Sequence, residues 1–361
     1  MVANIIGAKD VPAAQAPMPA RPTAAAAPQP SGPTVTSVTH IAPVTADAPC
    51  VERLVIDEAS EGQRLDNFLL RLLKGVPKTH VYRVIRSGEV RVNKARAGAD
   101  TRLVLGDEVR VPPVRRAAPT VAAKLSAPAR EFHVVHEDEH LLVIDKPAGV
   151  AVHGGSGVAF GVIEQLRRAR PEARFLELVH RLDKETSGLL LLAKKRSALT
   201  ALQEQFRDRA TGKRYLALVA GAWTAGLKVI DSALHKGLDA KGERHVRVVA
   251  ADHPDGRRSI SLVRIVTPYA RFSLLEVTLK TGRTHQIRVH LAHHGHPIVG
   301  DPKYGDFALN REMLRGAHRF SRMFLHAREL SFDHPASGVR LTLTAPIPAE
   351  CAELLAALAT I

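Results

Sequence analysis

The sequence contains few of the residues on which several protein classes depend. Only two of its 361 residues are cysteines, Cys50 and Cys351, which are too few and too far apart for a disulfide framework. No uninterrupted apolar run is long enough to span a bilayer. The N-terminus also lacks the basic-then-apolar order of a secretory signal. These absences argue against a secreted or membrane protein, and they predict a cytoplasmic protein without membrane contact.

Acidic residues are also in deficit. Asp and Glu total 36 against 51 Lys and Arg, which gives a formal net charge of +15. Such a charge attracts polyanions, so nucleic acid is the expected partner. The alternative is a basic protein whose charge is only a solvated surface, and charge alone does not separate the two.

The composition divides the chain into four segments. Residues 1–50 are rich in Ala and Pro and predict a disordered tail. Residues 114–129 are again rich in Ala and Pro and predict a linker. The segments between and after them, residues 51–113 and 130–361, are dense enough in apolar residues to predict two folded units.

The first unit has the pattern of a small α/β domain. Apolar residues recur at helical spacing over residues 65–72 and again over 81–85, where Ser87-Gly88 stops the second helix. Residues 89–93 and 107–111 alternate with period two and predict strands. Cations that we expect to contact RNA phosphates lie around these elements, at Arg71, Lys78, Arg83 and Arg86.

The first unit also carries a recognisable pattern. Arg64-Leu65-Asp66 at a helix start, a helix ending at Gly88, and Val90-Arg91-Val92-Asn93 together resemble the S4 RNA-binding module. This resemblance implies an RNA-binding domain.

The second unit predicts an α+β fold with a large, mainly antiparallel sheet. Strand-like runs occur at residues 141–144, 188–193 and 274–279. One helix is expected over residues 197–209. Another is expected to begin near Thr284, as N-cap, and to end at Gly295.

Two histidine-rich stretches invite a metal interpretation. His136-Glu137-Asp138-Glu139-His140 matches the H-E-x-x-H zinc signature, but two histidines four apart share a face only on a helix. The flanking apolar runs instead predict a hairpin, whose imidazoles diverge. A second cluster, which lacks Cys or carboxylate at ligand spacing, comprises His290, His293, His294 and His296. We therefore expect no metal.

A polar loop lies between two apolar runs. Residues 180–188 follow the apolar residues 176–179 and precede the run 189–192. Such a loop is typical of a catalytic pocket or of a salt-bridged turn, and periodicity alone favours the turn.

Five stretches resemble the RluA family of pseudouridine synthases. They are residues 180–188 (HRLDKETSG), 145–149 (DKPAG), 213–219 (KRYLALV), 281–290 (TGRTHQIRVH) and 300–305 (GDPKYG). The resemblance implies that the chain rotates and re-attaches uracil within RNA, and we expect it to act as a monomer. This isomerisation needs no cofactor, because no atoms or electrons are gained or lost.

The resemblance also assigns roles. Asp183 supplies the reactive carboxylate, which attacks the sugar, adds to the base or abstracts a sugar proton, and the sequence leaves these routes open. Arg288 is the cation that keeps Asp183 ionised, held on the predicted helix and suited to a bidentate grip. Tyr215 packs on the flipped uracil, and Arg181 fills the space that uracil leaves. Further residues expected to contact RNA are His180 and Arg283.

Residues 153–183 resemble one subgroup of the family, the RluC type, which modifies several uridines of 23S ribosomal RNA. The alternatives are the RluD type, the RluA type that acts on ribosomal and transfer RNA, and an RNA-binding protein that has lost activity. Intact Asp183, Tyr215 and Arg288 argue against the last.

Overall fold

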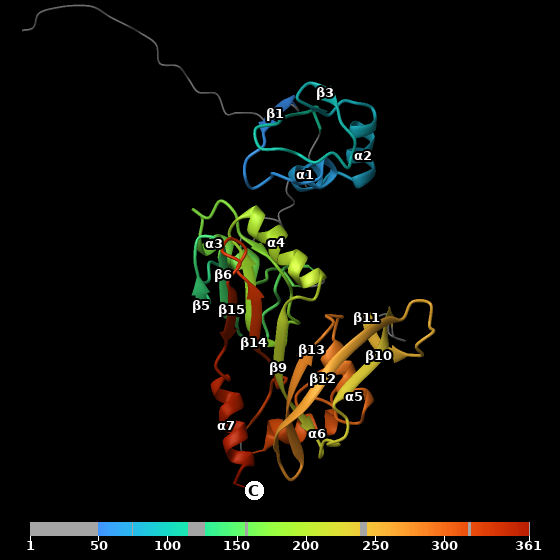
Figure 1. Cartoon of the computed structure of the whole chain (residues 1–361), viewed down its shortest axis with the longest axis vertical. Coiled ribbons are helices and arrows are strands. Elements are labelled where there is room, and N and C mark those ends of the chain that lie inside the picture. The colour runs from blue at the N-terminus through green and yellow to red at the C-terminus, as the bar shows by residue number, and fades with distance from the viewer. Residues whose placement is uncertain are drawn as a thin grey trace, which may run out of the picture. The chain divides into compact units, whose positions relative to one another are not determined.

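The computed structural model describes residues 50–73, 75–114, 127–155, 158–238, 244–316 and 319–360 (Figure 1). The predicted tail, residues 1–50, lies outside the described residues except for Cys50. Most of the predicted linker, residues 114–129, also lies outside them. The domain boundaries inferred from composition therefore stay a prediction.

Residues 50–114 form a four-stranded sheet with two helices. Its elements are β1 (Glu52–Val55), α1 (Leu65–Leu72), α2 (Lys78–Arg86), β2 (Arg91–Val92), β3 (Ala95–Arg96) and β4 (Glu108–Val111). The strand order is β1-β4-β2-β3. Both predicted helices and the two predicted strands are confirmed, whereas β1 and β3 were not foreseen.

The core of this part comes from the apolar faces of its helices. Leu65 and Leu69 of α1 and Val81 and Val84 of α2 are buried in one cluster. Gly88 follows α2 with φ +75°, a conformation that glycine adopts without strain. The sequence pattern that stopped the helix there is therefore confirmed.

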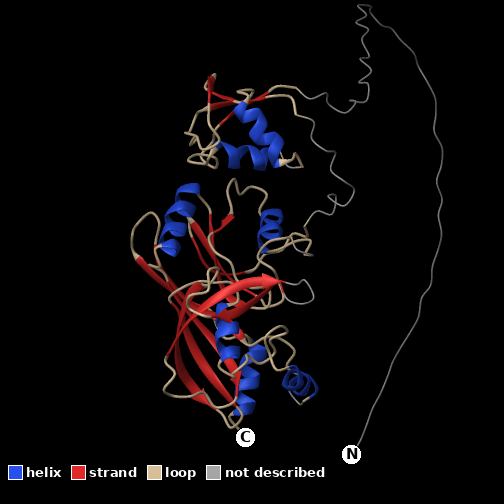
Figure 2. Ribbon diagram, turned by 90° about the vertical axis from the view of Figure 1, so that its right-hand side faces the viewer, coloured by secondary structure: helices blue, strands red, loops and turns tan. Residues whose placement is uncertain are grey.

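Residues 127–360 are built on an 11-stranded sheet, with helices along it (Figures 1 and 2). Its strands are β5 (His133–Glu137), β6 (Leu141–Lys146), β7 (Glu177–Leu178), β8 (Ser187–Ala193), β9 (Gly212–Ala220), β10 (Val229–Leu238), β11 (Arg244–Val249), β12 (Arg257–Pro268), β13 (Phe272–Leu279), β14 (Leu325–Asp333) and β15 (Arg340–Thr344). The helices are α3 (Val162–Ala169), α4 (Arg196–Arg207), α5 (Gln286–His293), α6 (Phe307–Arg315) and α7 (Ala349–Leu358).

The sheet order is β11-β10-β12-β13-β9-β14-β8-β6-β5, with β15 beside β14 and β7 beside β8. Among these strand pairs only β14 and β8 run parallel. The α+β fold with a mainly antiparallel sheet is therefore confirmed.

Strand β8 is buried on both faces, which explains its continuous apolar sequence. Leu190 and Leu192 point into one core cluster, and Leu189 and Leu191 point into another. All seven residues of β8 are buried. A loop that enters β8 is therefore tied to the rigid centre of the sheet.

Helix α5 starts one residue later than a Thr284 cap predicts. Its N-cap is His285, in a left-handed conformation with φ 54°, and no side chain caps the helix. Thr284 is thus not the N-cap, because the positive φ of His285 places that residue outside the helix. The predicted helix 197–209 is α4, Arg196–Arg207, which begins and ends slightly earlier.

The end of α5 follows the predicted glycine signal. Gly295 has φ +80° and donates its N–H to the carbonyl of Ala292 at 3.1 Å. The N–H of His296 donates to the carbonyl of Leu291 at 3.0 Å. These two bonds form a Schellman motif, which satisfies the last carbonyls of the helix.

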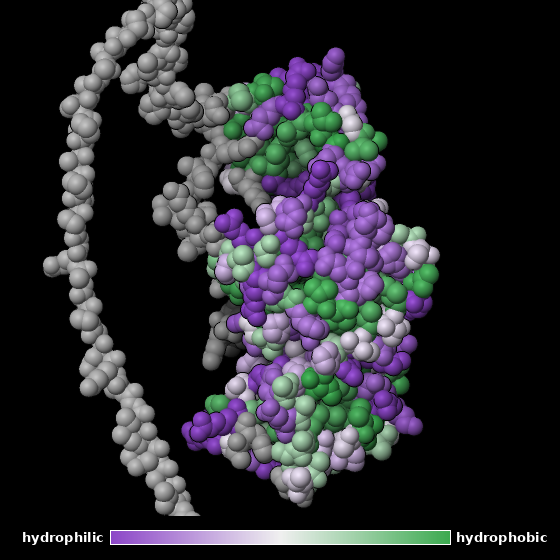
Figure 3. Space-filling view, turned by 90° about the vertical axis from the view of Figure 1, so that its left-hand side faces the viewer, coloured by the Kyte–Doolittle hydropathy of each residue, from purple (hydrophilic) through white to green (hydrophobic). Residues whose placement is uncertain are grey.

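Hydrophilic side chains cover much of the face drawn in Figure 3, with smaller apolar areas between them. Within the described residues, no helix is long and apolar enough to cross a membrane.

Candidate active site

Asp183 lies in the loop that joins β7 to β8, and the buried side chain of Lys146 hydrogen-bonds to this loop. Lys146 at the end of β6 is fully buried. Its Nζ donates to the carbonyls of Pro147 at 2.8 Å, Val150 at 2.9 Å and Lys184 at 3.1 Å. Burial lowers the pKa of Lys146 to about 7. The lysine thereby fastens the residue next to Asp183 to the turn after β6.

His180 ties the other side of the loop to the sheet. Its Nε2 accepts a hydrogen bond from the backbone N–H of Leu191 at 3.1 Å, and its ring stacks on Phe206 with centroids 4.9 Å apart. Burial, with a smaller effect of the Lys213 charge, lowers the pKa of His180 to about 4. The imidazole is therefore neutral, as an acceptor must be.

Gly188 follows the loop, near the start of β8, where this strand pairs with β14. Its φ is +110°, and a Cβ added there would lie 2.3 Å from the carbonyl oxygen of Ala327. Only glycine fits this approach, which explains why the motif of this loop ends in Ser-Gly.

Asp183, Arg288 and Asp301 form one charged group. Arg288 on α5 donates through NH1 to Asp183 Oδ2 at 3.2 Å. It donates through Nε and NH2 to the two oxygens of Asp301 at 2.7 and 2.8 Å. The side chain of Asp301 is 0% exposed, that of Arg288 5% and that of Asp183 19%. The predicted contact between Asp183 and Arg288 is present, but the bidentate grip expected for Asp183 is made on Asp301.

Electrostatics fixes the charges of Arg288 and Asp301. Burial disfavours the charged guanidinium, yet hydrogen bonds and the negative charge of Asp301, with a smaller contribution of Asp183, raise the pKa of Arg288. Burial also works against the Asp301 carboxylate, but Arg288 and two backbone N–H groups lower its pKa. Both groups are therefore ionised at neutral pH.

The sequence missed Asp301 as a site residue, although the stretch 300–305 was one of the matching motifs. Its Oδ1 accepts the backbone N–H of Lys303 at 2.8 Å and of Tyr304 at 3.0 Å. These bonds form a tight polar turn after α5, and an Asp-Pro pair in such a turn was the available signal.

His285 and Tyr304 complete the surroundings of Asp183, and neither was predicted. His285 Nε2 lies 3.9 Å from Asp183 Oδ2, and its Nδ1 lies 2.8 Å from the hydroxyl of Tyr304. The guanidinium carbon of Arg288 lies 5.0 Å from the centre of the Tyr304 ring. Burial lowers the pKa of His285, although the charge of Asp183 acts against it. The turn at His285 thus places an imidazole beside the carboxylate.

Asp183 lies between two cavities. The larger, about 430 Å³, has both polar and apolar walls, and its cations are Arg181, Lys184, Lys236, Arg288 and Lys303. The smaller, about 270 Å³, includes Tyr215 and apolar side chains of Leu279, Ile287 and Leu325. Burial, and then the negative charge of Asp183, raise the pKa of Tyr215, so its phenol stays protonated.

The predicted site residues of the second unit meet at the smaller cavity. Its lining includes all six of them, namely His180, Arg181, Asp183, Tyr215, Arg283 and Arg288. Arg181 and Arg283 are exposed.

The four predicted cations of the first unit lie on α1 and α2 and are exposed. Arg71 donates to the hydroxyl of Ser60 at 2.9 Å, and Arg86 donates to the carbonyl of Tyr82 at 3.3 Å. Arg83 lies 3.1 Å from Nδ1 of His80. The fourth of these cations is Lys78, the first residue of α2.

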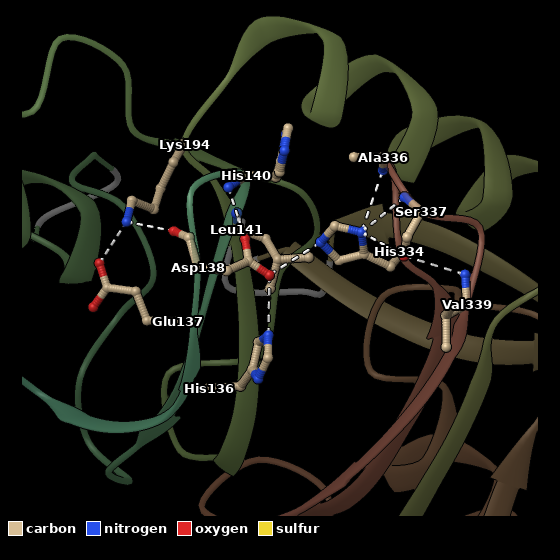
Figure 4. Close-up of polar contacts among 10 residues, drawn as sticks. All are labelled: His136, Glu137, Asp138, His140, Leu141, Lys194, His334, Ala336, Ser337 and Val339. Carbon is tan, nitrogen blue, oxygen red and sulfur yellow. Dashed lines mark hydrogen bonds and ion pairs between the residues drawn. The ribbon is translucent and has the colours of Figure 1, made fainter.

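The H-E-x-x-H stretch forms the predicted hairpin between β5 and β6 (Figure 4). Nε2 of His136 and Nε2 of His334 both lie near Asp138 Oδ2, at 3.1 and 3.0 Å, whereas His140 packs edge-on against His334. Glu137 instead pairs with Lys194 and Arg170, each at 2.8 Å. In the part of the chain that the structure describes, no group of three His, Cys, Asp or Glu side chains is arranged to hold a metal.

The second histidine cluster includes a structural residue. His290 on α5 is fully buried between two serine hydroxyls, Ser259 at 2.8 Å and Ser261 at 3.1 Å. Burial lowers its pKa to about 4. His293 and His294 are exposed at the end of the same helix.

Comparison with known proteins places this geometry in a family. The RNA pseudouridylate synthase family matches residues 140–293, and the S4 domain family matches residues 63–109. The chain belongs to the RNA pseudouridylate synthases, a class of RNA isomerases, and it carries an S4 domain. The family resemblance of the sequence is thereby confirmed.

Particular relatives are close in sequence. The chain is 48% identical to the ribosomal large subunit pseudouridine synthase C of Escherichia coli K12, over 83% of this chain and 94% of that protein. It is 47% identical to the protein of the same name from Salmonella typhi, over 86% of this chain and 98% of that protein. Among solved structures, human RNA pseudouridylate synthase domain containing 4 is similar, with a TM-score of 0.52 and 26% identity over 63% of this chain and 93% of that chain.

Proposed function

We propose that this protein isomerises uridines of 23S ribosomal RNA to pseudouridine, because its relatives are named ribosomal large subunit pseudouridine synthase C. The observation that carries the proposal is the Asp183 carboxylate, held against Arg288 at the junction of two cavities. The near-complete alignment with ribosomal large subunit synthases supports the choice of substrate.

The chemistry needs one ionised carboxylate near the ribose and base. The bond from C1′ to N1 breaks, uracil turns, and a bond from C1′ to C5 forms while the C5 proton moves to the solvent or N1. Asp183 attacks C1′, adds to the base or abstracts a sugar proton, and each route requires the charged form. Arg288 stabilises that form, and its own pairing with Asp301 fixes its position.

The target uridine enters the smaller cavity after leaving the base stack. The ring of Tyr215 and the apolar side chains beside it provide a surface for uracil. Tyr215 lines the same cavity as the carboxylate, and its protonated phenol can relay the C5 proton by giving its own proton to solvent as it accepts the one from C5. Arg181 is exposed beside Asp183, where its planar group can stack in the space that uracil leaves.

RNA affinity comes in part from the S4 domain. Its exposed cations on α1 and α2 suit phosphate contacts without sequence choice. We infer that the enzyme acts in the cytoplasm as a monomer, on precursors of the large ribosomal subunit.

Mapping pseudouridine in RNA from cells with and without this gene tests the proposal. We expect the deletion strain to lack pseudouridine at more than one position of 23S ribosomal RNA, with 16S ribosomal RNA and transfer RNA unchanged. Restoration by the wild-type gene, but not by Asp183→Asn, is the control. Loss confined to transfer RNA or to one ribosomal site would refute the substrate choice, and an unchanged map would refute the activity.

A further inference from the structure

Lys213 is a half-buried cation on the wall of the smaller cavity, and the mechanism above does not use it. We propose that its ammonium group binds a backbone phosphate of the RNA strand at the nucleotide that enters this cavity. This inference rests on the proposed function and adds a residue that positions the substrate.

Strand β9 directs the side chain of Lys213 toward the smaller cavity. Lys213 and Tyr215 are two residues apart, so their side chains point to the same face of the sheet, and both line the smaller cavity. The ammonium nitrogen lies 5.3 Å from the centre of the Phe206 ring, which also lines the cavity. Lys213 is therefore held at the cavity wall by an aromatic contact.

The surroundings of Lys213 lack an anion. Burial, and then the positive charge of Arg209, lower its pKa. Within the described residues no carboxylate forms an ion pair with Lys213. The neighbouring Arg214, on the opposite face, pairs with Glu329 at 3.1 Å. Because partial burial of a charge is unfavourable unless an opposite charge compensates it, Lys213 favours an anionic ligand.

The same cavity indicates which anion fits. Among the described residues that line it, the only carboxylate is Asp183, which is already bonded to Arg288. Besides Arg288, three cations line this cavity, namely Arg181, Lys213 and Arg283. In RNA the charged group is the phosphate, whereas uracil is neutral. A phosphate beside the flipped nucleotide therefore matches this charge better than the base does.

The test compares Lys213→Met with Arg214→Met in the full-length protein. Each variant removes one cation from adjacent positions of β9, but only Lys213 faces the cavity. The substrate is a 23S-derived stem-loop that the wild-type enzyme modifies. For Lys213→Met we expect KM to rise about tenfold, as for the loss of a charged hydrogen bond, with kcat within about twofold. The slope of log affinity against log salt concentration should also fall by about 0.7. Arg214→Met should change neither, and Lys213→Arg should restore most of the affinity.

A second measurement locates the phosphate. Single methylphosphonate linkages, which remove one phosphate charge, are placed at each position around the target uridine. We expect one position to weaken wild-type binding and to have no further effect in Lys213→Met. This measurement is decisive even if Lys213→Met does not fold, because absence of any sensitive phosphate in the wild-type enzyme would overturn the proposal.

Two other results would also overturn it. Equal behaviour of Lys213→Met and Arg214→Met would assign Lys213 to packing on Phe206. A fall in kcat with unchanged KM would assign it to the chemical step. Failure of the proposed function itself is separate, because then the wild-type enzyme forms no pseudouridine in the stem-loop.

Discussion

Arg288 makes two hydrogen bonds to Asp301 and only one to Asp183. The fully buried Asp301 is therefore the structural counterion of the arginine, and Asp183 is its second, weaker partner. This division has a chemical use. In the proposed reaction, Asp183 can release its one bond to Arg288, while Arg288 stays paired with Asp301 and in place.

Replacement of Asp301 by Asn should damage both folding and turnover. The variant leaves a buried guanidinium without its main counterion, so we expect the free energy of unfolding to fall by about 3 kcal/mol. Turnover should fall as well, because Arg288 is no longer held toward Asp183. Thermal unfolding and initial rates measure the two effects. The control is Asp231→Asn, which removes the exposed partner of Arg258 and should cost little. An unchanged melting temperature for Asp301→Asn would contradict the assigned role.

Replacement of Asp183 by Asn should abolish turnover and preserve RNA binding. The variant removes the reactive charge but keeps the shape of the side chain, and Arg288 retains Asp301. We expect kcat to fall by about 10⁴ or more, with Kd for the stem-loop nearly unchanged. Filter binding and pseudouridine detection on the same preparation measure both quantities. Turnover within about tenfold of wild type would exclude Asp183 as the reactive group.

The buried His290 should make the protein less stable in mild acid. Its pKa is lowered from 6.5 to about 4 in the folded state. Between these values the unfolded chain binds the extra proton, so the stability contributed by the neutral ring is present above pH 6.5 and is lost as pH falls toward 4. The full effect is about 3 kcal/mol.

Denaturant unfolding at several pH values tests this. His290→Gln should flatten the pH dependence, whereas His293→Gln, at an exposed position of the same helix, should change it only slightly, because burial contributes more than the His293 charge to the lowered pKa of His290. Equal slopes for wild type and His290→Gln would show that other groups cause the acid loss.

The exposed cations of α2 should set part of the salt dependence of RNA binding. Replacing Lys78 and Arg83 together by Gln should lower the slope by about 0.7 for each phosphate that these side chains neutralise in the wild-type complex. The control is Arg53→Gln, whose side chain pairs with Glu108 at 3.0 Å. An unchanged slope in the double variant would assign these cations to a solvated surface.

Much of the fold could be predicted from sequence because its elements obey local rules. The apolar period of α1 and α2, the continuous apolar sequence of β8 and the glycine at the end of α5 each reflect local backbone or burial requirements. The start of α5 could not be predicted. It depends on the positive φ of His285, which Gln286 stabilises by accepting the N–H of Arg283 at 3.0 Å and by donating to the carbonyl of Ile260 at 3.0 Å.

The candidate site could be predicted only in part, because some of its contacts form only in the folded structure. The motifs identified Asp183, Tyr215 and Arg288, and the fold brings all three to one cavity. Asp301 and His285 were missed, because their contacts arise only when the turn after α5 and the turn before it close around Arg288. The roles proposed for Lys213 and for the S4 cations depend on a bound RNA, which no sequence period encodes.

The loop that carries Asp183 is fastened at His180, Lys184 and Gly188. Its carboxylate therefore stays with the sheet, and in the proposed reaction the RNA must supply the movement that brings the target nucleotide to the carboxylate. Extruding a paired and stacked nucleotide costs a few kcal/mol, and a nucleotide in an open loop needs less. The rate of modification by such an enzyme depends on how stable the RNA structure is around the target nucleotide. Uridines in the same sequence context but with different base pairing are then modified at different rates. The uridines that leave the base stack most easily are modified fastest.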